Sequence, residues 1–87
     1  SGTAFFTYGL LWGMNNGFLD KATYQPVVEK AWKYLTTVAL QPDGRIGYVQ
    51  PIGEKAIPGQ VVDANSTANF GVGAFLLAAC EMVRFLN

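Results

Sequence analysis

The sequence contains no histidine and a single cysteine, Cys80. Histidine is the side chain that most often changes charge near neutral pH and ligates metals, so the chain lacks the commonest general base. One cysteine cannot form an intrachain disulfide, which leaves the redox compartment open. Because Cys80 lies among apolar residues, we expect a buried, inert thiol rather than a nucleophile. No cysteine or acidic cluster has the spacing of a zinc or calcium site, so no metal is predicted.

Charge is scarce and balanced. Charged residues make up 14% of the chain, and the six basic and six acidic side chains cancel without forming a basic run. The sequence therefore offers nucleic acid no electrostatic footprint. Hydrophobic residues make up 51% of the 87 residues. A domain near this size buries only about 60–65% of the surface that its unfolded chain exposes, so a large share of its surface stays in contact with water. The chain carries more apolar surface than it can cover by itself.

Residues 1–19 carry no charge, and residues 3–16 are predicted to form a helix that is apolar around most of its circumference. Ser1 or Thr3 can cap this helix with a hydroxyl group, and Gly17 is a typical stop. Such a helix must be buried, in a large core or in a membrane. Its glycines dilute the hydropathy and favour a soluble protein. Two glycines on one face would let a neighbouring helix approach closely: Gly9 and Gly13.

The second predicted helix has Pro26 in its first turn, where a missing N–H costs nothing. It follows a link at residues 18–25 in which Asp20 is the candidate start signal. Glu29 and Lys33 form a favourable pair on its solvent side. The opposite face has apolar residues at helical spacing, flanked by two aromatic residues: Val27, Val28, Ala31, Leu35 and Val38, with Trp32 and Tyr34 beside them. This helix is therefore amphipathic, with one face exposed to water.

Residues 41–66 show no helical period. Turn signals divide them, at Asp43-Gly44, at 52–53 and at 58–59, and residues 46–50 are suited to a short strand before Pro51. Structureless loops of this length are uncommon in compact domains unless they are functional. We therefore expect a functional loop that carries a small β-hairpin.

The third predicted helix covers residues 69–86, with Ser66, Thr67 or Asn69 as its cap. It has no charge before Glu81. Small residues form a spine along it: Gly71, Ala74 and Ala78. Like the first helix, it is apolar nearly all round and is predicted to be buried.

The order is thus a buried helix, a half-exposed helix and a second buried helix. Short connections make successive helices antiparallel, so the first and third are parallel and the second lies outside them. This order favours an all-α fold, a partial (α/α)6 toroid with inner, outer and inner helices and a long loop carrying a short β-hairpin. A complete three-helix bundle would instead give each helix a polar face. Residues 1–87 are then a single segment of a larger domain.

In that topology the Ser1-Gly2-Thr3 start, the loop 41–66 and the beginning of the third helix meet at one mouth. Two helix N-termini present free N–H groups and positive partial charge there, which suits an anionic ligand such as a sugar carboxylate. Plain capping by the hydroxyl groups is the alternative interpretation. Tyr48 and Gln50 are suited to contact a sugar by stacking and hydrogen bonding, or else to pack the loop.

Short segments in order along the chain carry a family resemblance: 1–10 (SGTAFFTYGL), 24–28 (YQPVV), 31–32 (AW), 43–44 (DG), 47–50 (GYVQ), 70–78 (FGVGAFLLA) and 81–82 (EM). They resemble the late part of the unsaturated glucuronyl and rhamnogalacturonyl hydrolases. The resemblance implies a six-hairpin α/α toroid that removes the terminal 4,5-unsaturated uronic acid from oligosaccharides left by polysaccharide lyases. Members of this family hydrate the vinyl-ether double bond with an aspartate as general acid/base, without a metal or organic cofactor. The compartment stays open between bacterial cytoplasm and periplasm.

The chain also departs from the complete family pattern. The catalytic aspartate, and the histidine and aromatic platform around the sugar, belong to earlier hairpins, so no residue here is predicted to be catalytic. Asp43, Glu54 and Asp63 match no catalytic position and are expected to form turns or to be solvated. Residues 1–87 are then the C-terminal part of an enzyme, inactive alone, whose partner is the remainder of the toroid. Substrate contacts are predicted at the mouth: Ser1, Gly2, Thr3, Tyr48 and Gln50.

Two other classes of protein stay open. One is a non-catalytic helical module whose mouth loop binds a glycan or a protein. The other is a membrane protein that spans the bilayer twice, with its first and third helices. The hydrolase interpretation expects an oligosaccharide as the ligand, and neither nucleic acid nor a membrane as a partner.

Overall fold

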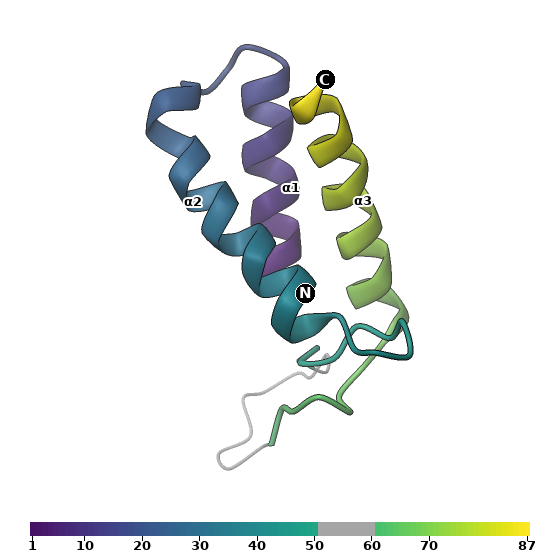
Figure 1. Ribbon diagram of the computed structural model, residues 1–87. Helices are drawn as coiled ribbons and strands as arrows, with labels where there is room; N and C mark the ends of the chain where they lie inside the picture. Colours follow the sequence, from purple (N-terminus) through teal and green to yellow (C-terminus); the bar gives the residue numbers. More distant parts are fainter. Residues whose placement is uncertain (51–60) are drawn as a thin grey trace, which may run out of the picture.

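The computed structural model describes residues 1–50 and 61–87. Their elements are three α-helices and one π-helical turn: α1 (Gly2–Asn15), α2 (Lys21–Tyr34), η1 (Leu35–Ala39) and α3 (Asn69–Leu86). In Figure 1, α1 and α3 run in the same direction and α2 runs in the opposite one. The predicted arrangement of two parallel helices joined through an antiparallel one is therefore confirmed.

The ends of α1 follow its polar and glycine residues. Ser1 is the N-cap, but its side chain makes no capping hydrogen bond, so the predicted hydroxyl cap is wrong. The helix ends at Asn16, whose side-chain amide donates to the Trp12 carbonyl at 2.8 Å. Gly17 then takes a φ of +78°, which is the left-handed stop that the sequence predicts.

The two α1 glycines differ in their surroundings. A Cβ on Gly13 would lie 2.6 Å from Leu19 Cδ1, so this glycine does allow a close approach, by the link that follows the helix. Gly9 is exposed, with nothing within 4 Å of where its Cβ would lie. The close approach expected at Gly9 is therefore not made by the described residues.

Asp20 starts α2, as predicted. Its carboxylate accepts the Thr23 backbone N–H at 3.1 Å and the Thr23 hydroxyl at 2.7 Å. This cap places the first helical residue at Lys21, so Pro26 lies in the second turn. The prediction that Pro26 occupies the first turn was wrong because the capping carboxylate, rather than the proline, decides where the helix begins.

The solvent side of α2 also differs from the prediction. Glu29 accepts a hydrogen bond from the Gln25 side-chain amide at 3.0 Å. The ion pairs among the described residues do not include Glu29 with Lys33. A carboxylate at this exposed position has two partners one turn away, and an exposed ion pair contributes too little to decide between them.

The helix changes pitch at its end. In η1 the Leu40 N–H donates to the Leu35 carbonyl at 2.9 Å, five residues earlier, which is the π-helical pattern. The Thr36 hydroxyl donates to the Trp32 carbonyl at 2.9 Å and the Thr37 hydroxyl to the Lys33 carbonyl at 2.6 Å. Threonine hydroxyls that bond back in this way compete with the regular ladder and help to end the helix.

Two buried clusters hold the helices together. One lies near the start of α1 and comprises Ala4, Leu35, Ala39, Ile46, Val49 and Ala74. The other lies further along α1 and comprises Leu11, Met14, Val28 and Met82. Trp32 packs against both clusters and stacks on Phe75 with 5.7 Å between the ring centroids. The small-residue spine of α3 is buried as predicted, at Gly71, Ala74 and Ala78.

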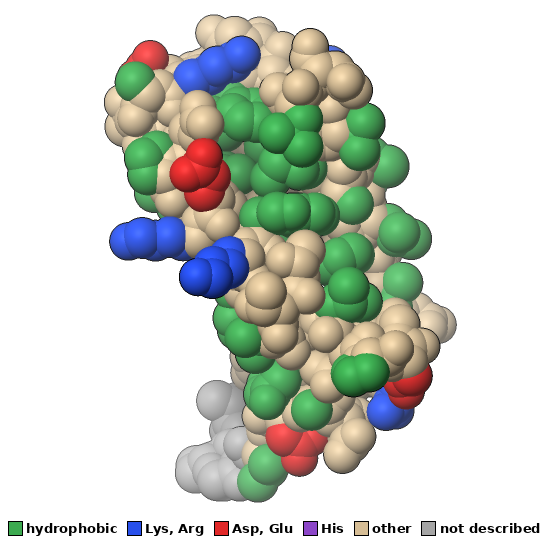
Figure 2. All heavy atoms as spheres, in the orientation of Figure 1, with side chains coloured by type: hydrophobic (Ala, Val, Ile, Leu, Met, Phe, Trp, Pro, Cys, Tyr) green, Lys and Arg blue, Asp and Glu red, His purple; other side chains and the backbone are tan. Residues whose placement is uncertain are grey.

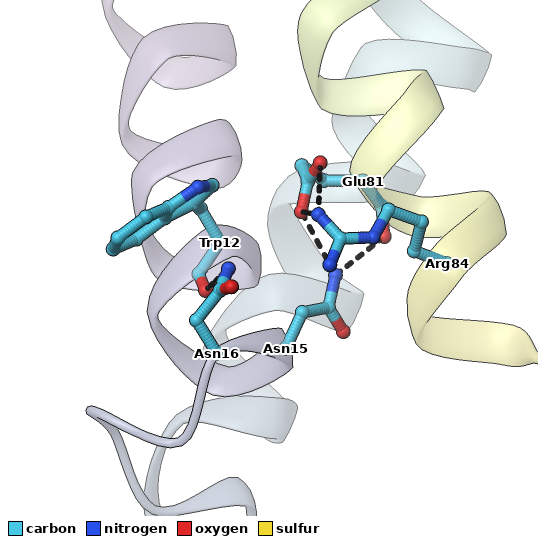
Figure 3. Close-up of polar contacts among 5 residues, drawn as sticks. All are labelled: Trp12, Asn15, Asn16, Glu81 and Arg84. Carbon is cyan, nitrogen blue, oxygen red and sulfur yellow. Dashed lines mark hydrogen bonds and ion pairs between the residues drawn. The ribbon is translucent and has the colours of Figure 1, made fainter.

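A polar contact joins the C-terminal ends of α1 and α3 (Figure 3). The Asn15 side-chain amide donates to the Glu81 carbonyl at 2.9 Å and to its carboxylate at 3.1 Å. Arg84 donates to both carboxylate oxygens, at 3.0 and 3.1 Å. Glu81 is only 8% exposed, so these partners satisfy a nearly buried charge.

Large parts of α1 and α3 are not covered by this chain. The exposed large side chains include Phe6 at 77% and Leu86 at 76%. Figure 2 shows hydrophobic side chains gathered along the visible face between α2 and α3, with the charged ones at its edges. Burial all round was therefore wrong for α1 and α3 within the described residues. Cys80 is exposed as well, on an apolar hollow of about 470 Å³ beside Phe5 and Leu77.

The predicted hairpin is not confirmed. The described residues contain one isolated antiparallel bridge, between Leu40 and Ile46, and residues 46–50 form no strand. The turn signals at 52–53 and 58–59, and Glu54, lie outside the described residues. For the two-span hypothesis, α3 is long and apolar enough to cross a membrane by length and composition alone. No other helix of residues 1–50 and 61–87 meets the same criteria.

Candidate functional site

A pocket of about 200 Å³ lies where α1 and α3 begin. The structure brings all five predicted substrate contacts to its lining: Ser1, Gly2, Thr3, Tyr48 and Gln50. Tyr34, from the end of α2, and Gly71, from the first turn of α3, line it as well. The predicted mouth therefore exists as a hollow, and the binding role of its residues stays a prediction.

Both inner helices begin at this pocket without a side-chain cap. The α1 N-cap, Ser1, makes no side-chain capping bond, and neither does the α3 N-cap, Ala68. The cap predicted at Ser66, Thr67 or Asn69 was wrong, because Ser66 Oγ accepts the Asp63 N–H at 3.0 Å instead. Most first-turn N–H groups have no partner within their own helix, although the Gly71 N–H donates to the Ala68 carbonyl at 3.0 Å. The two helix starts thus bring hydrogen-bond donors and positive partial charge to this end.

The wall opposite α1 is built by residues 46–50. The Gly47 N–H donates to the Ala39 carbonyl at 2.7 Å, which ties this segment to η1. The next two N–H groups, of Tyr48 and Val49, donate to the Asp63 and Ser66 carbonyls, each at 2.8 Å. Val49 is 2% exposed and belongs to the core cluster. The segment is therefore fixed by its backbone on one side and by a buried side chain on the other.

The lining side chains of this pocket are uncharged. They supply hydroxyl groups, one amide and two phenol rings among small apolar residues. Such a lining can bind a polar ring by hydrogen bonds and stacking. Among the described residues it offers no carboxylate or imidazole to transfer a proton.

The loop carboxylates make local turns. Asp43 pairs with Arg45 at 2.7 Å, and the pKa of Asp43 is lowered, chiefly because the Arg45 backbone N–H donates to it, while the guanidinium adds to the effect. Asp63 accepts the Asn65 N–H at 2.9 Å. Neither carboxylate lines the pocket, so both are turn formers, as the sequence suggested.

Tyr34 was the lining residue that the sequence interpretation missed. It was assigned to the flank of the buried stripe of the second helix, and at 38% exposure it is a half-open aromatic residue. The available signal was its place near the end of that helix, next to the loop that forms the mouth. A π-helical turn follows Tyr34 directly, and no sequence pattern indicated that turn.

Residues 1–86 match the family described as Glycosyl Hydrolase Family 88. The chain belongs to this family. The resemblance drawn from its segments is thereby confirmed. Two curated relatives are both named unsaturated 3S-rhamnoglycuronyl hydrolase. The chain is 48% identical over 84 residues to the one from Formosa agariphila, which is 97% of this chain and 21% of that protein.

The second relative comes from an Alteromonas strain, with 45% identity over 83 residues, 95% of this chain and 19% of that protein. The family 88 chain thus spans about a fifth of the length of these curated relatives. A solved family 88 structure from Bacteroides vulgatus is 75% identical, with a TM-score of 0.90 over 98% of this chain and 24% of its own. The predicted partial toroid is therefore confirmed.

A second solved structure, named as a polysaccharide lyase, is 90% identical to this chain. Its TM-score is 0.90, over 99% of this chain and 24% of its own. Lyases and unsaturated uronyl hydrolases stand on opposite sides of one double bond, because a lyase creates it and the hydrolase removes it. In an assay of the ultraviolet absorbance of that double bond, a lyase therefore raises the absorbance and an unsaturated uronyl hydrolase lowers it.

Proposed function

We propose that this family 88 chain is the C-terminal segment of an unsaturated uronyl hydrolase. The complete enzyme removes a terminal 4,5-unsaturated uronic acid from oligosaccharides that lyases release. The observation that carries the proposal is the uncharged pocket of this family 88 chain. The starts of α1 and α3 meet there, and Tyr48 and Gln50 line it as well. Both curated relatives carry the name of a hydrolase of unsaturated sugars, which supports this substrate class.

The proposed reaction adds one water across the vinyl-ether double bond. A proton goes to one carbon and a hydroxyl group to the carbon that bears the ring oxygen, after which the ring opens and the remaining sugar departs. The described lining of the pocket has no side chain suited to deliver that proton near neutral pH. This chain therefore contributes binding and orientation, and the general acid/base lies in the remainder of the toroid.

The N-terminal turn of α1 supplies the first binding element. Ser1 and Thr3 offer hydroxyl groups at the start of a helix, where a carboxylate is favoured by free N–H groups and by the positive end of the helix dipole. Gly2 is exposed and has nothing within 4 Å of its Cβ position, so a ligand can approach the backbone there. We assign the uronic acid carboxylate to this turn.

The remainder of the toroid is the proposed partner of the uncovered faces. The hollow between α2 and α3, of about 370 Å³, is lined by Trp32, Met82 and Phe85 among others, and side chains such as Phe6 stand open on α1. Relatives four to five times as long, in which this chain covers 19–21% of the length, have ample chain to cover them.

The test is the ultraviolet absorbance of the conjugated double bond in an unsaturated disaccharide. The full-length protein is expected to bleach it, and residues 1–87 alone are expected to leave it unchanged. If the full-length protein instead raised the absorbance of an intact uronic acid polysaccharide, a lyase would be indicated. Binding of the disaccharide without turnover by the full-length protein would favour a non-catalytic glycan-binding module.

A further inference from the structure

Tyr48 has a backbone conformation that tyrosine rarely adopts. Its φ is +58°, and it is the non-glycine residue with positive φ among residues 1–50 and 61–87. Left-handed backbone brings Cβ close to the following carbonyl oxygen, so glycine, asparagine or aspartate usually occupies it. A bulky aromatic residue in this region is a genuine outlier, and such outliers gather at ligand-binding sites.

The neighbouring residues prevent this strain from relaxing. The N–H groups of Gly47, Tyr48 and Val49 donate at 2.7–2.8 Å to three carbonyls, that of Ala39 and those of Asp63 and Ser66 in one turn. On one side of Tyr48, a Cβ on Gly47 would overlap the Ala64 carbonyl. On the other side, Val49 is 2% exposed, in the core cluster. Three hydrogen bonds and one buried side chain therefore hold the backbone of Tyr48 where it is.

Tyr48 is more exposed than either of its neighbours and lines the pocket. Gly47 and Val49 are buried, whereas Tyr48 is 37% exposed and lines the pocket together with Ser1 and Gln50. A glycine or an asparagine would satisfy the same backbone with less strain. The backbone conformation alone does not call for a tyrosine, so the reason for the ring lies in what occupies the pocket.

We infer that Tyr48 is an affinity-determining contact for the sugar ring, held in a strained conformation that lowers the stability of the protein. The inference rests on the proposed function and names the residue that grips the substrate. The phenol offers an apolar face to the C–H side of a pyranose and a hydroxyl group for one hydrogen bond. Because the contact is made equally before and during the reaction, it acts on KM rather than on kcat.

The experiment substitutes Tyr48→Asn in the full-length protein and measures melting temperature together with KM and kcat on an unsaturated disaccharide. We expect the melting temperature to rise by about 1–3 °C because asparagine tolerates the left-handed region. We expect KM to rise about tenfold, since a ring that buries apolar area on a ligand is worth that factor. The value of kcat should change little. Tyr48→Phe keeps the ring and the strain, and should keep the melting temperature and most of the affinity.

Tyr34→Asn is the matched control for stability. Tyr34 lines the same pocket and is 38% exposed, yet its φ of −59° is an ordinary helical value. The same substitution there should lower the melting temperature, because asparagine is a poorer fit to a helix and no strain is relieved. If the melting temperature rose for Tyr48→Asn and fell for Tyr34→Asn, the effect of the backbone conformation would be separated from the loss of an aromatic side chain.

Two outcomes would overturn the inference. A lower melting temperature for Tyr48→Asn would mean that the ring packs against the protein rather than a ligand. An unchanged KM would mean that the ring does not touch the sugar, even if the protein became more stable, and the proposed function would survive both results. If the wild-type protein did not act on unsaturated disaccharides at all, the proposed function would fail and the sugar contact with it, whatever the melting temperatures.

Discussion

A methyl group added at Gly47 tests how the loop wall of the pocket is held. The Cβ of Gly47→Ala would lie 2.9 Å from the Ala64 carbonyl carbon and 3.0 Å from its Cα, whereas ordinary contact begins at 3.4 Å. The Ala64 carbonyl oxygen would lie closer still. Backbone atoms cannot rotate away as a side chain does, so one segment must move by about an ångström. The two hydrogen bonds next to the clash, from Tyr48 to Asp63 and from Val49 to Ser66, would lengthen with it.

This geometry sets the expected size of the effect. Overpacking typically costs about 1–3 kcal/mol, and weakening two backbone hydrogen bonds adds about 1 kcal/mol. We therefore expect Gly47→Ala to lower the free energy of unfolding of the full-length protein by about 2–4 kcal/mol, measured by denaturant titration. Because Tyr48 moves with the segment, KM for the unsaturated disaccharide should rise as well.

Gly44→Ala is the control in the same loop. Gly44 has a φ of +88° but nothing within 4 Å of its Cβ position, and it does not line the pocket. Alanine there meets only the left-handed backbone, so stability should fall by about 1 kcal/mol with KM unchanged. If Gly47→Ala behaved like Gly44→Ala in both measurements, the close packing of the loop wall against Ala64 would be refuted.

Three further predictions concern the core, the surface and the isolated chain. Glu81→Ala should cost about 1–3 kcal/mol of unfolding free energy because it removes the carboxylate that accepts from both Asn15 and Arg84. Arg84→Ala should cost less than about 1 kcal/mol because its side chain is 53% exposed and Asn15 still donates to the Glu81 carboxylate; equal losses would contradict the role given to Glu81. The folded-state pKa of Asp43 lies below its ordinary value of 3.8. The Asp43 carboxylate therefore stabilises the folded protein at pH values above 3.8, and this stabilisation is lost as the pH falls through the folded-state pKa. The stability difference between wild type and Asp43→Asn should therefore shrink in acid, and a difference that grows would contradict this sign. Isolated residues 1–87 should associate and bind hydrophobic dyes, and a sharp cooperative melt from a clean monomer would show that the exposed apolar faces need no partner.

The sequence predicted the helices well because their signals are local or periodic. Asp20 caps α2 through its own side chain, and Gly17 takes the left-handed turn that only a few residue types favour. The small residues of α3 pack inward as their spacing indicates. Pro26 was expected in the first turn of α2 because proline is well tolerated there, but the cap at Asp20 starts the helix early enough to place it in the second turn.

The details that failed depend on partners far along the chain. Ser66 was a reasonable cap for α3, but its hydroxyl accepts the Asp63 N–H within the loop. Cys80 was expected to be buried because its neighbours are apolar, yet it is exposed on an apolar hollow that no other part of the described residues covers. The hairpin is not confirmed in residues 46–50, where backbone bonds run to Ala39 and to the turn that contains Asp63 and Ser66 rather than along one paired strand.

The pocket could be predicted in outline and not in its most informative detail. Two parallel inner helices bring their starts and the long loop to the same end of the fold. The sequence therefore predicted that Ser1, Tyr48 and Gln50 lie together, and all three line the pocket. The positive φ of Tyr48 could not be foreseen, because tyrosine has no preference for it. Its cause lies in the hydrogen bonds of the two flanking residues and in the packing of Val49.

The central claim is that this family 88 chain forms one wall of a sugar pocket whose acid/base lies in the remainder of the protein. The most direct measurement compares full-length protein with residues 1–87 on an unsaturated disaccharide, followed by ultraviolet absorbance. The account predicts steady bleaching by the full-length protein and none by residues 1–87 at the same molar concentration. Bleaching by residues 1–87 alone would place the acid/base inside this chain and contradict the account.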